Sequence, residues 1–349
     1  MSSAKPTQND SSPLELEPIG SLDEVADDWE RLALASGNLF ATPSWIECWS
    51  RHTPDFPKHT VYQACRRPDG SLAAILPLVL IEGRHVRKLR LAGFGAGWGL
   101  GPICAPEDLD SAYGALGRAL SVNDESWDAF FGDDLAATGR AEQIGARLLY
   151  ELPSPLVRLE CPSWEEFLNS RAKRLRHETK RLSRRAQERG LAFRLVEEEA
   201  ELFAVLDVLF AQHLKRWGKH AAHWFAGRPQ LHREFAREAL SRGWLRLLVA
   251  EENEEIVGVS LGYRMGSSEW SYQASRKIAT ETSGLGLLVR AEKIKRALED
   301  GVRYFWLGPG AQEEKLRFAT DVAKLETVAI ACTFRGRLAL RRVRAPEEG

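Results

Sequence analysis

The fold is decided by the stretch from Trp244 to Lys315, which reads WLRLLVAEENEEIVGVSLGYRMGSSEWSYQASRKIATETSGLGLLVRAEKIKRALEDGVRYFWLGPGAQEEK. Runs rich in β-branched and aromatic residues predict strands over 244–250, 256–265 and 269–274. Short polar turns separate these runs, so the sequence predicts an antiparallel meander.

A glycine turn follows the meander at 281–286, where the sequence reads ETSGLG. Apolar residues then recur at helical spacing as far as Gly301, a typical C-terminal stop, so we expect a helix there. A glycine turn that opens a helix leaves backbone N–H groups unpaired at the positive end of the helix dipole, and it therefore suits a phosphate. The glycines alone are equally typical of an ordinary turn. A dinucleotide site is disfavoured, because the turn does not follow a parallel strand with an acidic residue about 20 positions further on.

Composition indicates a globular protein with reduced thiols. The chain has 349 residues, 44% of them hydrophobic and 28% charged, and its 48 basic and 49 acidic residues give a formal net charge of -1. This balance offers no global attraction to nucleic acid or to an anionic membrane, so such a partner would need a local patch. The five cysteines lack metal-ligand or disulfide spacing, which favours a cytoplasmic protein without a metal site. They are Cys48, Cys65, Cys104, Cys161 and Cys332.

Residues 1–13 are polar and rich in serine, which predicts a disordered tail rather than a signal peptide. No apolar run approaches the roughly 20 residues that a membrane-spanning helix needs, so we expect a soluble protein.

The N-terminal part predicts helices and short strands. A capping box at Ser21 opens a helix to about Ala35, and Pro43 opens a second helix in which Trp45 and Trp49 share a face, favouring core packing over ligand contact. Strands are expected over 61–64, 72–81 and 86–91, and Pro77 within the second run indicates an edge or a bulge.

The segment 93–102 holds five glycines and Trp98, which offers a stacking surface for a substrate. The alternative is a wide connecting loop. A boundary is expected near 153–162, where Pro153, Pro155 and Pro162 cluster.

A basic helix is predicted over 171–190, which carries nine Lys and Arg residues. Its narrow apolar stripe consists of Ala172, Leu175, Thr179, Leu182 and Ala186. The outer face could hold phosphates of tRNA, of a CoA nucleotide or of lipid headgroups, or it could be an ordinary solvated face.

A further helix ends with His213 and Trp217, four residues apart, with Arg216 beside them. A histidine that titrates near neutrality suits a general base for an amine, and a packed, hydrogen-bonded histidine is the alternative.

An ordered set of short motifs carries a resemblance that extends over most of the chain. The set consists of FATPSWIECW at 40–49, ILPL at 75–78, HLKRW at 213–217, SGLG at 283–286, and LGPG at 307–310 followed by Lys315. In this order the motifs resemble those of the CelD/BcsL-like acetyltransferases of the GNAT superfamily, which are related to the Fem aminoacyl transferases.

The resemblance implies an α/β (α+β) fold of two tandem GNAT-like acyltransferase domains, each a mixed, mostly antiparallel sheet flanked by helices. The first domain would be a degenerate copy over 14–160, and the second, over 161–345, would bind the acyl donor. No metal is implied. The loop near Trp98 would line the space between the domains.

The resemblance also implies site residues. The strand ending at Tyr272, Gln273 and Ala274 would pair with the pantetheine arm, and Lys315 and His213 would be catalytic. Acceptor contacts would come from Arg216, Trp217, Trp98 and Tyr272. The pyrophosphate would lie on main-chain N–H groups of Ser283, Gly284, Leu285 and Gly286.

Three positions depart from the family pattern. Glu281 replaces the usual Gln or Arg of the glycine turn, Trp306 replaces an Asp before the LGPG motif, and Glu314 replaces a Tyr before Lys315. Loss of the Asp removes an obvious carboxylate partner for the acceptor.

The implied function is transfer of an acyl group, acetyl from acetyl-CoA, to an amine on an amino sugar or small metabolite of envelope or exopolysaccharide metabolism. A second reading is Fem-like transfer from aminoacyl-tRNA, with nucleic acid bound through helix 171–189. A third is a non-catalytic binding protein that keeps the fold.

Overall fold

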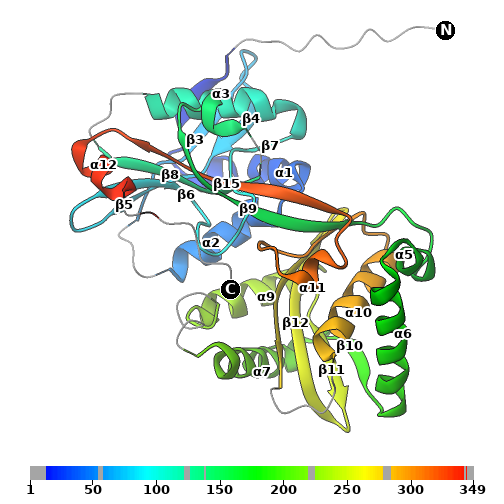
Figure 1. Ribbon diagram of the computed structural model, residues 1–349. Coiled ribbons are helices and arrows are strands. Elements are labelled where there is room, and N and C mark those ends of the chain that lie inside the picture. Colours follow the sequence, from blue (N-terminus) through cyan, green and yellow to red (C-terminus); the bar gives the residue numbers. More distant parts are fainter. Residues whose placement is uncertain are drawn as a thin grey trace, which may run out of the picture.

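The structure, a computed structural model, describes residues 13–53, 58–121, 126–136, 139–218, 225–277, 284–341 and 343. It contains an eleven-stranded sheet in the order β10-β11-β12-β13-β14-β9-β15-β8-β6-β5-β2 and a four-stranded sheet in the order β1-β3-β4-β7. Helices flank both sheets (Figure 1). This mixed, antiparallel-dominated α/β architecture confirms the predicted fold class.

The N-terminal elements are β1 (Glu15–Pro18), α1 (Ala26–Ser36), α2 (Pro43–Arg51), β2 (Lys58–Thr60), β3 (Gln63–Arg66), β4 (Leu72–Leu76), β5 (Leu78–Glu82), β6 (Arg87–Leu91), β7 (Ile103–Cys104), α3 (Leu109–Ser121), β8 (Ala129–Leu135) and α4 (Arg140–Gln143), with 3-10 turns at Leu22–Glu24, Leu39–Ala41 and Pro106–Asp108. The later elements are β9 (Arg147–Arg158), α5 (Trp164–Ser170), α6 (Lys173–Glu188), β10 (Ala192–Leu195), α7 (Glu199–Trp217), α9 (Pro229–Ser241), β11 (Leu248–Glu252), β12 (Glu255–Met265), β13 (Ser268–Arg276), α10 (Leu285–Glu299), β14 (Tyr304–Trp306), α11 (Glu313–Leu316), β15 (Asp321–Ala331) and α12 (Phe334–Leu340).

The predicted meander is present as β11, β12 and β13, which pair antiparallel in sequence order. The amphipathic pattern of α6 is also confirmed, since Leu175, Thr179, Leu182 and Ala186 are buried. Ala172, the first residue of the predicted stripe, is exposed at the N-cap of this helix.

Strand β15 joins the two parts of the chain. It lies between β9 and β8 and pairs antiparallel with both, so one sheet runs from β10 to β2. Figure 1 shows β15 and β9 side by side along the middle of the molecule. Strand β9 precedes residue 160 but pairs with β14, and β15 follows it but pairs with β8, so each strand has a partner on the other side of the predicted domain division.

The run 72–81 forms two strands in different sheets. Strand β4 ends before Pro77 and joins the small sheet, whereas β5 begins after it and joins the large one. Proline has no N–H for a ladder, and the carbonyl of Pro77 instead accepts a bond of 2.7 Å from Ala92 N.

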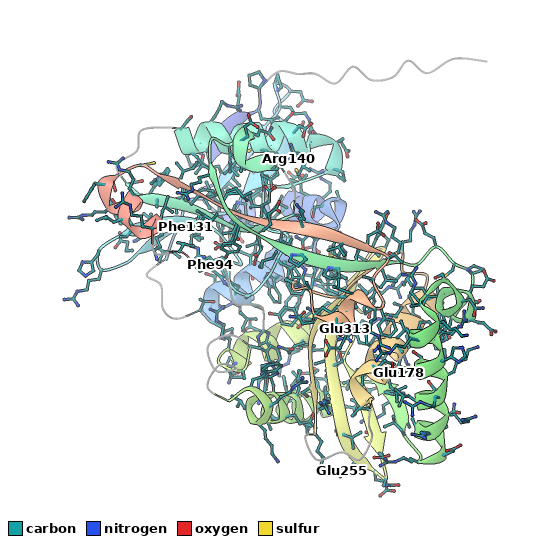
Figure 2. The ribbon with its side chains drawn as sticks, viewed as in Figure 1. Phe94, Phe131, Arg140, Glu178, Glu255 and Glu313 are labelled. Carbon is teal, nitrogen blue, oxygen red and sulfur yellow. The ribbon has the colours of Figure 1, made fainter. Side chains whose placement is uncertain are left out.

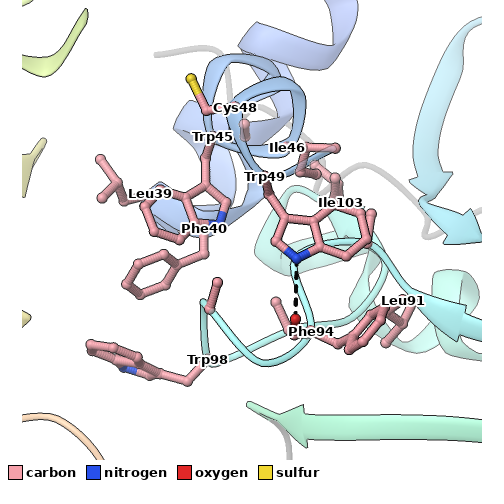
Figure 3. Close-up of a cluster of buried hydrophobic side chains, with 14 of the residues drawn as sticks. Leu39, Phe40, Trp45, Ile46, Cys48, Trp49, Leu91, Phe94, Trp98 and Ile103 are labelled. Carbon is pink, nitrogen blue, oxygen red and sulfur yellow. Dashed lines mark hydrogen bonds between the residues drawn. The ribbon is translucent and has the colours of Figure 1, made fainter. Parts of the chain in front are cut away.

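Aromatic side chains fill the core beneath α2. Trp45 and Trp49 are fully buried, as predicted, and Trp49 Nε1 donates to Phe94 O at 3.1 Å (Figure 3). The glycine segment 93–102 packs onto this cluster. An added Cβ on Gly97 would lie 2.8 Å from Phe40 Cβ, so this glycine permits close packing rather than approach of a ligand.

We expect Gly336→Ala to lower the free energy of unfolding by about 1–3 kcal/mol, because the added Cβ would lie 2.0 Å from the backbone oxygen of Asp128. Urea denaturation measures the change. Gly286→Ala is the control, since no atom lies within 4 Å of its added Cβ. Equal stability of the two variants would contradict the close packing of α12 on β8.

Candidate functional site

Strands β13 and β14 separate at the centre of the C-terminal part. They pair in parallel only over Ser268–Trp270 and Tyr304–Trp306, although β13 continues to Arg276. After Trp306 the chain follows β9 instead, because Leu307 N donates to Pro155 O at 2.9 Å and Gly310 N donates to Pro153 O at 2.8 Å. In the part of the chain that the structure describes, no strand pairs with the remaining edge of β13.

A bulge lies in β13 where its pairing with β14 ends. Leu261 pairs with Gln273 and Gly262 pairs with Ser271, so Tyr272 is the extra residue. Bulges re-aim side chains and are common beside active sites. Beyond the bulge, Ala274 and Arg276 are exposed.

The N-terminus of α10 lies beside the far end of this strand. Gly284 is the N-cap with φ 84°, and its carbonyl accepts from the amides of Leu287 and Leu288. The amides of Leu285 and Gly286 precede these bonds, in the positions where a helix has no internal acceptor. Ser283, the first predicted pyrophosphate ligand, lies outside the described residues.

Helix α6 packs against the same turn. A Cβ on Gly284 would lie 2.5 Å from Leu182 Cδ1, so only glycine fits here. Leu182 and Ala186 share a core with Leu285 and Leu288. The basic helix therefore lies next to the helix terminus that was predicted to bind a phosphate.

His213 and Gln273 come together between α7 and β13. Their Nε2 atoms lie 2.9 Å apart, and Gln273 Oε1 accepts from Ala274 N at 3.0 Å. Because this amide fixes the Gln273 oxygen, its nitrogen donates and His213 Nε2 accepts. Gln212, next to His213, also ties α7 to β13 through Ser275 Oγ at 2.9 Å.

His213 is held neutral by its surroundings. It is 6% exposed, and burial together with the nearby Arg216 guanidinium lowers its pKa. Its Nδ1 has no partner among the described residues. The sequence predicted that Trp217 shares a face with His213, but Trp217 is 46% exposed and lies under the Arg216 guanidinium, 4.8 Å from its ring centre. Four residues take the helix 400° around its axis, slightly more than one turn, so His213 lies on the buried face and Trp217 lies just outside it.

Lys315 binds the glycine loop at 307–310, which reads LGPG. Its Nζ donates to Pro309 O at 2.5 Å and to Gly308 O at 3.3 Å. Burial, and then the charge of Arg290, lower its pKa to about 8. The ammonium is therefore mostly protonated at neutral pH, and it fixes the loop that separates β14 from β13.

Further cations lie near this loop, and two of them, Arg276 and Arg290, were not predicted as site residues. Burial and Arg276 lower the pKa of Arg216, and Glu314 opposes this effect. Burial also lowers the pKa of Arg290, whose Nη1 donates to Glu314 O at 3.1 Å. Arg276 and Arg290 could have been found from spacing, since Arg276 is two residues after Ala274 on one strand and Arg290 is four residues after Gly286 on one helix.

The predicted roles of Trp98 and Tyr272 in substrate contact need correction. The rings stack at 5.7 Å with an interplanar angle of 12°, and both are about 6% exposed. Tyr272 Oη donates to Ala96 O at 2.7 Å. Neither ring offers an open face to a substrate, because both are buried among other aromatic rings, where such rings pack favourably.

A pocket of ≈ 230 Å³ lies in the N-terminal part, but it has no reactive group. Burial raises the pKa of its Cys104 to about 12, and its Asn38 side chain donates to Gly99 O. Among the described residues no group of His, Cys, Asp and Glu could hold a metal ion, and none of their helices is long and apolar enough to cross a membrane.

Comparison with known proteins bears on the family and the fold. Residues 173–316 match the family described as "Acetyltransferase (GNAT) domain". None of the curated proteins matches the sequence. The fold is similar to that of FemX, with a TM-score of 0.64 and 11% identity over 93% of this chain and 99% of that one.

Two other solved structures are similar in fold. The C-terminal domain of a putative synthetase from Agrobacterium fabrum gives a TM-score of 0.61 at 12% identity, over 92% of this chain and 95% of that one. L-PGS from Bacillus licheniformis gives 0.57 at 12% identity, over 91% and 95%. At such identity these likenesses show the fold. They confirm the predicted fold, the family match over residues 173–316 supports the predicted N-acyltransferase class, and the CelD/BcsL-like subfamily stays a prediction.

We expect Gln273→Glu to raise the pKa of His213 by about 1–3 units, because a carboxylate beside Nε2 stabilises the imidazolium. NMR titration of the histidine ring protons measures it, and His232 serves as the internal reference. An unchanged His213 titration would contradict the contact between these side chains.

Buried histidines should also make stability depend on pH. Burial, mainly, lowers the pKa of His232 to about 3, so the unfolded chain binds a proton near pH 6.5 that the folded chain does not bind. Stability is then full above pH 6.5 and falls by up to about 1.4 kcal/mol per pH unit per histidine as the pH drops toward 5. Denaturation at several pH values checks this. His232→Phe should flatten the dependence, and an equally steep profile would contradict it.

Proposed function

We propose that this protein transfers an acyl group, acetyl from acetyl-CoA, to an amine acceptor such as an amino sugar or a small metabolite of envelope or exopolysaccharide metabolism. The observation that carries the proposal is the separation of β13 from β14 beside the N-terminus of α10. The open strand edge suits the amide-bearing arm of CoA, and the helix terminus next to it suits the pyrophosphate.

The donor would extend along β13 beyond Trp270. Its amides would pair with the backbone near Gln273 and Ala274, and the pyrophosphate would lie on the amides of Leu285 and Gly286. The side chain of Gln273 now occupies Ala274 N. A pantetheine carbonyl would replace it there, which would release the Gln273 side chain at the moment the donor binds.

Transfer needs a neutral amine and a proton acceptor. The amine nitrogen would attack the thioester carbon, the new C–N bond would form, and the C–S bond would break with CoA leaving as its thiolate. His213 is neutral at pH 7 and can take the proton that the amine loses at Nε2 once Gln273 has moved. Lys315 supplies a positive charge on the loop opposite, where it can steady the developing oxyanion.

The acceptor would carry an anionic group beside its amine. Arg276 lies close enough to Arg216 to lower its pKa and Glu314 close enough to oppose this, but no carboxylate among the described residues lies within ion-pair distance of either guanidinium. The exposed ring of Trp217, next to Arg216, offers a face on which a sugar can lie. These three side chains favour a phosphorylated or acidic amino sugar over an uncharged amine.

A second candidate is Fem-like transfer from aminoacyl-tRNA, which the outer face of α6 favours. Of its basic residues, Lys180 and Arg184 pair with Glu165 and Glu188 at 3.4 and 4.0 Å, both exposed contacts of little strength. If tRNA is the donor, reversing charges on this face should reduce the salt dependence of RNA binding. Calorimetry with acetyl-CoA separates a third candidate, a non-catalytic binding protein, which should give no heat.

We expect Gly286→Asp to weaken retention of acyl-CoA by at least about tenfold, because its carboxylate would face the pyrophosphate at the start of α10. Native mass spectrometry after incubation with mixed acyl-CoA molecules measures retention. Gly286 is a better position than Gly284, since Gly284 has φ 84° and would press on Leu182.

The matched control is Gly286→Ala, which adds no charge and should retain the donor. A thermal melt of both variants tests the fold. Equal retention by Gly286→Asp and the unaltered protein would exclude this turn as the donor site.

A further inference from the structure

Helix α12 presents an apolar stripe to solvent. Its inner face is fixed to the sheet by Gly336, which approaches Asp128 O, and by Leu340, which packs with Phe131. Phe131 is labelled in Figure 2. At 100° per residue the opposite face is centred on Phe334 and Leu338. These side chains are 65% and 42% exposed and lie one turn apart.

Arginines flank this stripe on both sides. Arg335 lies on one side, and Arg337 and Arg341 lie on the other, as the same 100° rotation places them. All three are exposed, and none lies within ion-pair distance of a described carboxylate, although the charge of Arg335 helps to lower the pKa of the buried Asp128. Monomeric proteins rarely place large apolar side chains together in the open, and such patches mark interaction sites.

A groove of ≈ 870 Å³ runs between α12 and the turn that joins β5 to β6. Lys88 lies in it, half-buried, with its Nζ 5.8 Å from the centre of the Phe131 ring. The nearby carboxylate, Asp133, is already held by Arg90 through contacts of 2.5 and 2.9 Å. The rest of the lining includes the cations Arg84 and Arg335 and the apolar side chains of Leu338 and Val343, together with the polar residues His85, Tyr150 and Thr327.

We propose that the outer face of α12 and the Arg84–Lys88 turn together form a docking surface for an anionic phospholipid membrane. Phe334 and Leu338 enter the boundary between headgroups and acyl chains, and the arginines beside them contact the phosphates. The groove receives one headgroup phosphate at Lys88. Apolar side chains inside a ring of cations match the layered chemistry of this boundary.

Two other occupants fit less well. A nucleic acid would bring phosphates over Phe334 and Leu338, and burying these side chains against a charged backbone gives no gain. A second copy of this chain would place the same arginines against one another across a two-fold axis, and like charges repel. The surface lies on the other part of the sheet from α10 (Figure 1), so it does not depend on the acyl-transfer proposal.

Sedimentation with vesicles tests the proposal. The full chain should bind vesicles that contain phosphatidylglycerol and should not bind vesicles of phosphatidylcholine alone. Phe334→Ser with Leu338→Ser should weaken binding by about tenfold or more, because it removes the apolar contact with the membrane. Separately, Arg335→Glu with Arg337→Glu should weaken binding by about tenfold or more, since each interfacial arginine contributes roughly 1 kcal/mol. Lys88→Ala should weaken binding less.

Matched controls separate the alternatives. Leu34→Ser removes an exposed apolar side chain from α1, and Arg184→Glu with Arg185→Glu reverses charge on α6; both variants should bind as the unaltered protein does. Absence of vesicle binding, or loss of binding in the α6 variant alone, would overturn the proposal. So would a dimer in sedimentation analysis that Phe334→Ser with Leu338→Ser converts to monomer.

Discussion

The path of the chain after Trp306 is the constraint on which the site depends. Hydrogen bonds from Leu307 and Gly310 hold this segment to β9, and Gly308, with φ 80°, lets the backbone turn away from β13. Lys315 then binds the carbonyls of Gly308 and Pro309. Were the segment paired with β13 instead, the sheet would close, and no strand edge would be left for an extended donor.

Two buried charged side chains, Lys293 and Glu269, lie where β13 and β14 separate. Lys293 of α10 is buried near Glu269, and its Nζ lies 3.5 Å from Oγ of Ser271, which follows the last residue of β13 that pairs with β14. Gly262 makes room for it, since an added Cβ would lie 2.6 Å from this nitrogen. The opposite charges of Lys293 and Glu269 attract each other and so link α10 to β13 at this point, and Glu269 also forms an ion pair of 3.4 Å with Arg246.

Features that repeat along the sequence were predictable, whereas those set by distant segments were not. The stripe of α6 and the meander follow from spacing alone. The burial of Trp98 and Tyr272 does not, because nothing near either residue shows that Phe40 packs over both rings. The place of β15 between β9 and β8 was also beyond local pattern, since an edge and a central strand have similar composition. For the donor turn, sequence identified Gly284 and Gly286 but could not separate the packed glycine from the open one.

Strand β15 also relates the two surfaces to each other. It starts five residues after Leu316 of α11, close to the loop that Lys315 holds, and it leads directly into α12. Its 11 residues span roughly 35 Å at the usual rise of a strand. Because β15 pairs on both sides, this separation is fixed rather than hinged. A lipid headgroup bound beside α12 therefore cannot also be the acceptor at His213. In the proposed arrangement α12 would hold the protein at a membrane surface, and the open edge of β13 would hold the acyl donor.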